Sequence, residues 1–275
     1  MATIRPFRAL RPAPPVVERT SAVPYDVVNT QEAMKLAEGN PLSFLRVSRA
    51  EIELPPGTDL HSEVVYEKAA ENFDRLRRAA PLVFEDEPAV YFYRQRMGSH
   101  VQTGLAACYS VDEYDADLIK KHERTRRDKE DDRTRHIISL RAQTGPVFLV
   151  YRASTEVDRV AAEVTAGPPL FDFVAVDGVG HTVWRVQGED LDMLVEAFAA
   201  LPRLYIADGH HRAASAARTR KYLCERGGEP SPEADWFLAV AFPHDQMQVL
   251  PYNRVIRDLN GHTATAFLDA LRARA

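Results

Sequence analysis

The stretch from Lys120 to His136 constrains the fold of this chain more than any other, because it offers no apolar side chain to a core. Its seventeen residues lie between Ile119 and Ile137 without an aliphatic side chain and without a Phe, Tyr or Trp. If this charged segment is helical, pairs such as Glu123 with Arg127 stabilise it by only about 0.2–0.5 kcal/mol each. We therefore predict that it does not dock on a core and that it is mobile or ordered by a ligand.

The charge of this segment differs from that of the whole chain. Eight Lys or Arg residues stand against five carboxylates within it, whereas the net charge of the chain is −5. A locally basic segment in an acidic protein favours a polyanionic ligand such as a nucleotide, although a solvated charged loop explains the same pattern. His122 and Glu123 begin a zinc-protease-like motif, but Arg126 stands where the second histidine would be, which disfavours a metalloprotease.

Around the charged segment, short apolar runs alternate with helical patterns. Residues 1–24 contain five prolines and are expected to be extended. The helices expected from apolar spacing and end signals are 31–38, 61–79, 191–198 and 212–224. The expected strands are 44–47, 83–84, 89–95, 104–109, 146–151, 171–176, 181–186, 204–207 and 236–242. This order predicts an α+β fold with mixed, largely antiparallel sheets and flanking helices.

Length, charge and cysteine usage narrow the class of protein. A chain of 275 residues is long enough for one large or two modest domains. No apolar run approaches the roughly 20 residues of a membrane helix, no signal peptide is recognisable, and Cys108 and Cys224 lack metal-ligand spacing. We therefore expect a cytoplasmic protein with reduced thiols, no membrane partner and, given its negative charge, no nucleic-acid partner.

The segment Asp208-Gly209-His210-His211-Arg212 is the clearest candidate for a functional site. It lies between an apolar strand and an alanine-rich helix, so that N–H groups without intrahelical partners face outward at the helix start. With the helix dipole they form an anion site, in which Gly209 permits close approach or a positive φ. Arg212 can donate two hydrogen bonds to a phosphate, and His210 and His211 offer further donors.

Asp208 is unexpected in a site for anions. It would be useful there if it held a magnesium ion beside the phosphates or oriented one of the histidines. An alternative needs no ligand: Asp208 caps the helix and the histidines decorate the turn. Tyr25 and Asp26 could line the same cleft from the entry segment, and a plain turn explains them equally well. No P-loop, nucleophile elbow or dinucleotide fingerprint is present, so the common kinase, hydrolase and dehydrogenase scaffolds lack support.

At these residues the sequence resembles the bacterial and archaeal domain-of-unknown-function 1015 family. The matching elements follow one another along nearly the whole chain: Ile4–Phe7, Pro24–Val27, Asn40–Leu45, Lys121–Thr125, Asp132-Arg133, Ala207–Arg212 and Leu250–Arg254. Members of that family are longer, so we expect this chain to be truncated or simply short. The 208–212 turn is also similar to the phosphate-binding turn of the ParB and sulfiredoxin superfamily, which includes free-serine kinases.

The resemblance implies a small-molecule kinase that phosphorylates free L-serine to O-phosphoserine, with ATP or ADP and Mg²⁺ as the nucleotide and cofactor. It implies that Asp208 assists the reaction or holds the metal and that Glu123 is the base, with Asp26 and Asp208 as competitors for that role. His122, the residue before Glu123, is also expected to be catalytic. The residues expected at the acceptor are Tyr25 and Asp26, and those expected at the phosphates are Lys121, Thr125, Arg133, Gly209, His210, His211 and Arg212.

The resemblance also implies a division of the chain. Residues 1–60 and 145–275 would form a ParB/sulfiredoxin-like, nucleotide-binding core, and residues 61–144 an inserted α+β region carrying the charged segment. The alternative function is a non-catalytic nucleotide-binding regulatory module, which binds nucleotide through Arg212 without turnover. A DNA-binding protein of the ParB kind is disfavoured by the acidic balance and by the lack of a recognisable recognition helix. The acceptor and the oligomeric state, a homodimer included, are left open.

Overall fold

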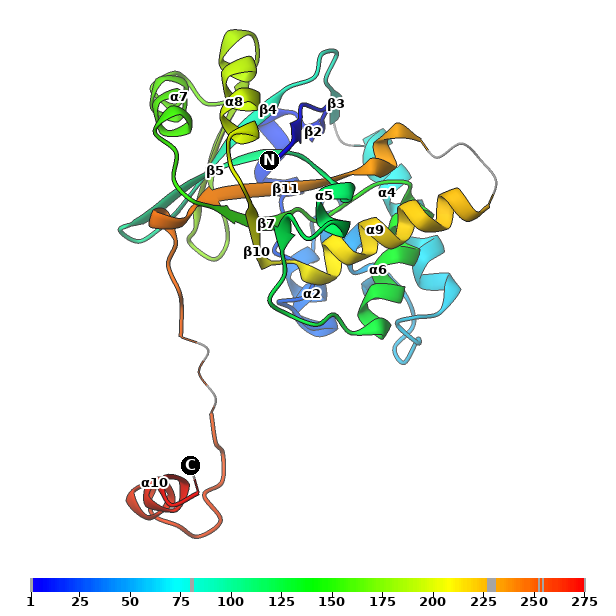
Figure 1. Ribbon diagram of the computed structural model, residues 1–275. Helices are drawn as coiled ribbons and strands as arrows, with labels where there is room; N and C mark the ends of the chain where they lie inside the picture. The colour runs from blue at the N-terminus through cyan, green and yellow to red at the C-terminus, as the bar shows by residue number, and fades with distance from the viewer. Residues whose placement is uncertain (1, 80–81, 227–230, 252, 254, 275) are drawn as a thin grey trace.

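A mixed β-sheet forms the centre of the computed structural model, which describes residues 2–79, 82–226, 231–251, 253 and 255–274 (Figure 1). Within these residues the sheet has nine strands. Eight follow one another in the order β6 (Ile119–Lys120), β10 (Leu204–Asp208), β7 (Val147–Tyr151), β11 (Trp236–Pro243), β5 (His100–Ser110), β4 (Val90–Met97), β9 (Gly180–Val186) and β8 (Phe171–Val174). The ninth, β1 (Ile4–Arg5), pairs with β5.

Most neighbouring strands of this sheet run antiparallel, whereas β6 with β10 and β7 with β11 are parallel. A separate two-stranded sheet pairs β2 (Leu10–Pro12) with β3 (Leu82–Phe84). The predicted α+β fold with mixed, largely antiparallel sheets is therefore confirmed. Strands from residues 61–144 lie in the same sheet as strands from residues 145–275, and the proposed division of the chain stays a prediction.

The main core lies between this sheet and the helices α7 (Thr155–Thr165) and α8 (Glu189–Ala199). Alternate residues of the strands enter it, as expected for a sheet with a buried face. Fully buried side chains include Leu105, Leu149, Leu194 and Phe198. Two alanines of α9 (His210–Glu225), Ala213 and Ala216, belong to the same core, which anchors the helix that follows the 208–212 turn.

The remaining helices gather beside α9. Here α6 (Arg127–Leu140) packs against both α9 and α4 (Glu63–Ala79), and α4 also contacts α3 (Leu45–Ser48). A second apolar cluster of Val47, Val65, Ala69, Leu76 and Leu140 joins α3, α4 and α6. The other helical elements are η1 (Pro14–Val16), α1 (Val17–Thr20), α2 (Thr30–Ala37), η2 (Ala50–Glu53), α5 (Val111–Asp115), η3 (Pro232–Asp235), η4 (His244–Gln246) and α10 (Ala264–Arg272).

Three predictions about elements are wrong. Residues 1–24, expected to be extended, contain the helical turns η1 and α1. The expected strand at 44–47 is the helical turn α3, because the Arg46 guanidinium donates to the carbonyls of Ala37 (2.8 Å) and Asn40 (3.0 Å) and holds the chain against the end of α2. A short apolar run does not distinguish a strand from a helix. The charged segment was predicted not to dock on a core, but its helix α6 packs against α4 and α9.

The charged segment docks through polar contacts in place of an apolar stripe. Thr134 and His136 of α6 are buried, at 8% and 4% exposure. Ser215 Oγ of α9 donates to Glu130 O (3.2 Å), and Tyr66 of α4 donates its hydroxyl to Asp132 (2.8 Å). Because these polar groups find partners on α4 and α9, residues 127–136 of the segment form a docked helix that the apolar pattern did not predict.

In the described part of the chain, every helix is too short or too polar to cross a bilayer. The predicted helix at 61–79 corresponds to α4, and the helix predicted to begin at Arg212 begins two residues earlier, at His210. Two positions of the Leu250–Arg254 motif, Tyr252 and Arg254, lie outside the described residues.

Candidate functional site

Gly209 makes the turn by which β10 enters α9. Its φ of 89° lies in the left-handed region, and a Cβ built on it would lie 3.3 Å from Val147 Cα in β7. Both observations explain why glycine is suited to this position. The first backbone bond of the helix runs from Ala213 N–H to Gly209 O (3.0 Å). Within the described residues, the N–H groups of His210, His211 and Arg212 precede this bond and have no acceptor, so the start of α9 can accept an anion.

The Arg212 side chain lies against the turn, because a Cβ built on Gly209 would lie 3.5 Å from Arg212 Cδ. Its Nη2 donates to both carboxylate oxygens of Asp26 (3.0 and 2.8 Å), and its Nη1 donates to Pro146 O (3.0 Å). The side chain is 12% exposed, whereas that of Asp26 is 41% exposed. Among the described residues, its buried Nε has no hydrogen-bond partner. The guanidinium is thus held in place and already carries one oxyanion, the carboxylate of Asp26.

Tyr25 lies between two guanidinium groups. Its ring centre is 4.0 Å from Arg133 Cζ and 5.6 Å from Arg212 Cζ. Burial raises the pKa of its hydroxyl, the largest of several effects, so the phenol is neutral at physiological pH. The structure therefore brings together four residues predicted for the site from three distant parts of the sequence: Tyr25, Asp26, Arg133 and Arg212.

His210 and His211 connect the 208–212 turn to the loop before α6. The backbone N–H of His122 donates to His210 Nε2 (3.4 Å), and that of Arg126 donates to His211 Nε2 (3.0 Å). A ring nitrogen that accepts a hydrogen bond is unprotonated, so both imidazoles are neutral with their hydrogen on Nδ1 in this arrangement. This acceptor role was not predicted from the sequence, because backbone donors leave no signal in side-chain identity.

The contact of His211 also joins two helix starts. Arg126 is the N-cap residue of α6, so the N-terminus of α6 lies one imidazole ring away from the N-terminus of α9. Both ends carry partial positive charge. The two helix starts are therefore joined by one side-chain contact, although Asp128 and Glu130 lie in the first turn of α6.

Glu123 lies on the other side of His210. Its Oε2 is 3.4 Å from His210 Nδ1, and its side chain is 59% exposed while that of His210 is 2% exposed. Burial lowers the pKa of His210, and the neighbouring His122, whose ring is 4.4 Å away, lowers it further. The exposed Glu123 carboxylate therefore lies next to a buried imidazole at the start of α9 and can still contact a ligand from solvent.

The remaining predicted residues occupy different places. Lys121 turns away from the 208–212 turn: its ammonium bonds the Tyr114 carbonyl and lies 4.1 Å from the Tyr114 ring centre. Asp208 is 67% exposed and lies 3.5 Å from Arg212 Nη1. Thr125 is half-buried in the loop beside His211. Over the described ranges, no group of three or more His, Cys, Asp or Glu side chains is arranged to hold a metal ion.

The contact of His210 with the His122 amide predicts an effect of pH. Burial holds the pKa of His210 below its ordinary value of 6.5, so the contribution of this contact to stability is complete above that value and is lost as pH falls through the lowered pKa. Protonation removes the acceptor that His122 N–H uses. We expect the amide of His122 to lose hydrogen-exchange protection as the pH falls from about 7.5 through the lowered pKa of His210.

The amide of Ala213, which bonds Gly209 O, is the internal control for this effect and is expected to keep its protection. Unchanged protection of the His122 amide over the same pH range would contradict the acceptor role of His210.

Comparisons with known proteins give one match. A family model described as "Protein of unknown function (DUF1015)" matches residues 4–275. Neither the search of curated proteins nor the search of solved structures finds a match to this chain.

Proposed function

The chain belongs to the DUF1015 family, and on this premise we propose that it is a nucleotide-dependent phosphotransferase with free L-serine as its first candidate acceptor. The carrying observation is that the Arg212 guanidinium, from the first turn of α9, already bonds a carboxylate, while the first N–H groups of that helix have no acceptor among the described residues. Phosphoryl transfer needs mainly positioning and positive charge around the phosphates. The second helix start, at α6, offers a place for another phosphate of the same nucleotide.

In this proposal, an arriving phosphate competes with Asp26 for Arg212. The released Asp26 carboxylate, 41% exposed, then faces the acceptor and can accept hydrogen bonds from its ammonium group. Tyr25, a neutral phenol beside it, donates to the acceptor. Lys121 would have to leave the Tyr114 carbonyl to reach the phosphates, and Thr125 would contact them from the loop.

The metal in this proposal is Mg²⁺, which commonly uses one or two carboxylates together with phosphate oxygens and water. Asp208 fits this use, because its carboxylate is exposed and adjacent to the 208–212 turn. The metal would supply charge to the phosphates at that place. The reaction requires neither membrane nor nucleic acid, and we assign it to the cytoplasm. The ParB/sulfiredoxin-like core of residues 1–60 and 145–275 belongs to the same proposal.

The direct experiment is to incubate the protein with L-serine and either MgATP or MgADP and to measure O-phosphoserine. We expect product with one of the two nucleotides. Binding of both nucleotides without product would reject the kinase and favour the alternative, a non-catalytic nucleotide-binding regulatory module.

Glu123 is proposed as the base that takes the proton of the acceptor hydroxyl, with His122 beside it. Its carboxylate touches His210 at the start of α9 and remains 59% exposed toward solvent. We expect Glu123→Gln to lower kcat by about 100-fold and to leave the KM for nucleotide within about twofold, as for loss of a general base. Product formation in a coupled assay measures both.

Glu225→Gln is the matched control for Glu123→Gln. Glu225 is an exposed carboxylate at the far end of α9, where it lies 3.8 Å from Lys221. It should retain kcat. If Glu123→Gln is as active as the wild type, the base lies elsewhere while the phosphotransferase proposal stands.

A further inference from the structure

We propose that Asp132 is a positioning residue for this site: it holds Arg133 against Tyr25 and thereby sets where Asp26 and Arg212 lie. The importance of Asp132 for catalysis rests on the proposed function. The contacts that connect Asp132 to Arg212 do not depend on that function, because they exist without any ligand.

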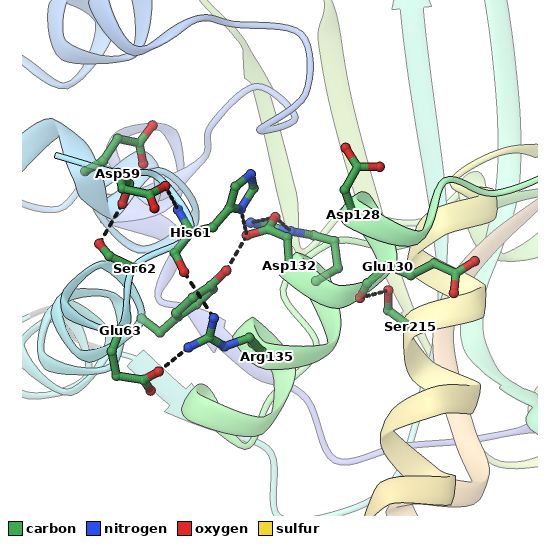
Figure 2. A network of polar contacts seen from close by, with 12 residues as sticks. Asp59, His61, Ser62, Glu63, Asp128, Glu130, Asp132, Arg135 and Ser215 are labelled. Atoms are coloured by element: carbon green, nitrogen blue, oxygen red, sulfur yellow. Dashed lines mark hydrogen bonds and ion pairs between the residues drawn. The ribbon is translucent and has the colours of Figure 1, made fainter. Parts of the chain in front are cut away.

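Asp132 is a buried carboxylate with three different partners. It is 11% exposed and accepts from the Tyr66 hydroxyl (2.8 Å) and from Arg133 Nε (2.8 Å), with His61 Nδ1 3.5 Å away. Burial alone would raise its pKa, but Arg133 and Tyr66 outweigh burial and hold the pKa below the ordinary value. Figure 2 shows Asp132 on α6 facing His61 and the start of α4. A permanent charge is thus fixed between two helices.

The next link is the Tyr25 ring. Arg133, which bonds Asp132 through Nε and Nη2, places its Cζ 4.0 Å from the ring centre. Arg212 approaches the same ring at 5.6 Å, and Asp26, the next residue after Tyr25, bonds Arg212. Every step from Asp132 to Arg212 is therefore a single contact between neighbouring side chains.

Electrostatics explains why this chain of contacts needs Asp132. The guanidinium groups of Arg133 and Arg212 lie 4.0 and 5.6 Å from the centre of the Tyr25 ring. Their positive charges repel one another unless a negative charge lies beside each. Asp26 matches Arg212, and Asp132 matches Arg133. Without Asp132, Arg133 is free to leave Tyr25 or to compete for Asp26. Either change shifts the Arg212 guanidinium, which lies near Tyr25 and bonds Asp26.

If Asp132 only held α4 and α6 together, the neighbouring ion pair of Arg135 and Glu63 would have the same role. Arg135 of α6 bonds Glu63 of α4 and also donates to His61 O (3.0 Å), so it joins the same two helices (Figure 2). Arg135 reaches the Asp132 network through the Tyr66 ring, 4.5 Å from its Cζ, and among the described contacts neither Arg135 nor Glu63 bonds Arg133 or Tyr25. Glu63→Gln is therefore a matched control that weakens the α4–α6 contact and leaves the connection to Tyr25 intact.

The test is a double-mutant cycle with inorganic pyrophosphate as the probe, measured by calorimetry on the full chain. We expect Asp132→Asn to weaken pyrophosphate binding by about tenfold and Glu63→Gln to change it by less than about twofold. In a Tyr25→Leu background, Asp132→Asn should cause no further loss, because the link through the ring is already absent. Thermal unfolding of each variant checks that it is folded.

The positioning role would be overturned if Asp132→Asn still weakened pyrophosphate binding by about tenfold in the Tyr25→Leu background. It would also be overturned if Glu63→Gln weakened binding as much as Asp132→Asn does. A second readout without any ligand is the exchange rate of the Arg133 and Arg212 side-chain N–H signals in NMR spectra. Both rates should change in Asp132→Asn and stay unchanged in Glu63→Gln; an unchanged Arg212 signal in Asp132→Asn would also overturn the role.

The two proposals fail in different ways. Absence of O-phosphoserine together with intact pyrophosphate coupling rejects the kinase and supports the positioning role. If the wild-type protein binds no pyrophosphate, the phosphate site itself is rejected, and the NMR exchange rates decide the role of Asp132.

Discussion

Arg212→Ala is expected to weaken nucleotide binding by about 100-fold, the largest effect on binding that we expect from a single substitution in this site. The guanidinium has a carboxylate on Nη2 and the Pro146 carbonyl on Nη1, so its plane is fixed before a ligand arrives. Hydrogen bonds to charged groups contribute about 1.5–3 kcal/mol each, and about 2.7 kcal/mol corresponds to a 100-fold change in Kd. The substitution also leaves the Asp26 carboxylate unmatched, and this charge repels a phosphate.

Titration calorimetry with MgADP measures this effect, and two variants control it. Arg212→Lys keeps the charge but not the planar fork, so we expect an intermediate affinity. Arg218→Ala removes an arginine of the same helix that pairs with Glu130 and Asp131, away from the turn, and should bind as the wild type does. Wild-type affinity in Arg212→Ala would remove the 208–212 turn from the phosphate site and with it the proposed function.

Acid is expected to destabilise the protein by roughly 3 kcal/mol through one buried histidine, His136 of α6. Its side chain is 4% exposed and its Nε2 lies 3.2 Å from Val47 O, to which it donates. Burial, assisted by the nearby Arg133, lowers its pKa from 6.5 to about 4. A depressed pKa gives stability that is complete above pH 6.5 and is lost as pH falls toward about 4. Each pKa unit corresponds to about 1.4 kcal/mol.

Urea unfolding at pH 7 and pH 4 measures this loss, with His136→Gln as the comparison. The glutamine amide can donate to Val47 O and does not titrate, so the variant should lose less stability on acidification than the wild type by roughly 3 kcal/mol. Identical pH dependence in the two proteins would show that His136 is not the group responsible. Because both proteins contain the same Asp and Glu residues, the contribution of those residues to the pH dependence cancels in the comparison.

Local pattern determined much of the site in advance. The 208–212 turn was predicted because a strand, a glycine and an alanine-rich helix follow one another directly, and each depends on neighbours in sequence. The structure bears this out in the 89° φ of Gly209 and in the helix that starts at His210. The long helix at 61–79 was equally predictable, because its apolar spacing repeats over more than four turns.

Contacts between distant segments were not predictable in this way. The charged segment forms a docked helix because Tyr66 and Ser215 supply polar partners, and these lie on other helices. Residues 44–47 form a helical turn because Arg46 bonds the end of α2. Neither effect has a periodic signature in the sequence.

By itself, then, the sequence determined the family, the mixed α+β class and the strand–glycine–helix turn at 208–212, because these follow from local residue order and from motifs. Only the tertiary structure decided that His210 and His211 bind the loop before α6, that Lys121 points away, and that Asp132 reaches Arg212 through Tyr25. The physical reason is that a hydrogen bond or ion pair depends on where two backbones meet, and residue type alone does not contain that information.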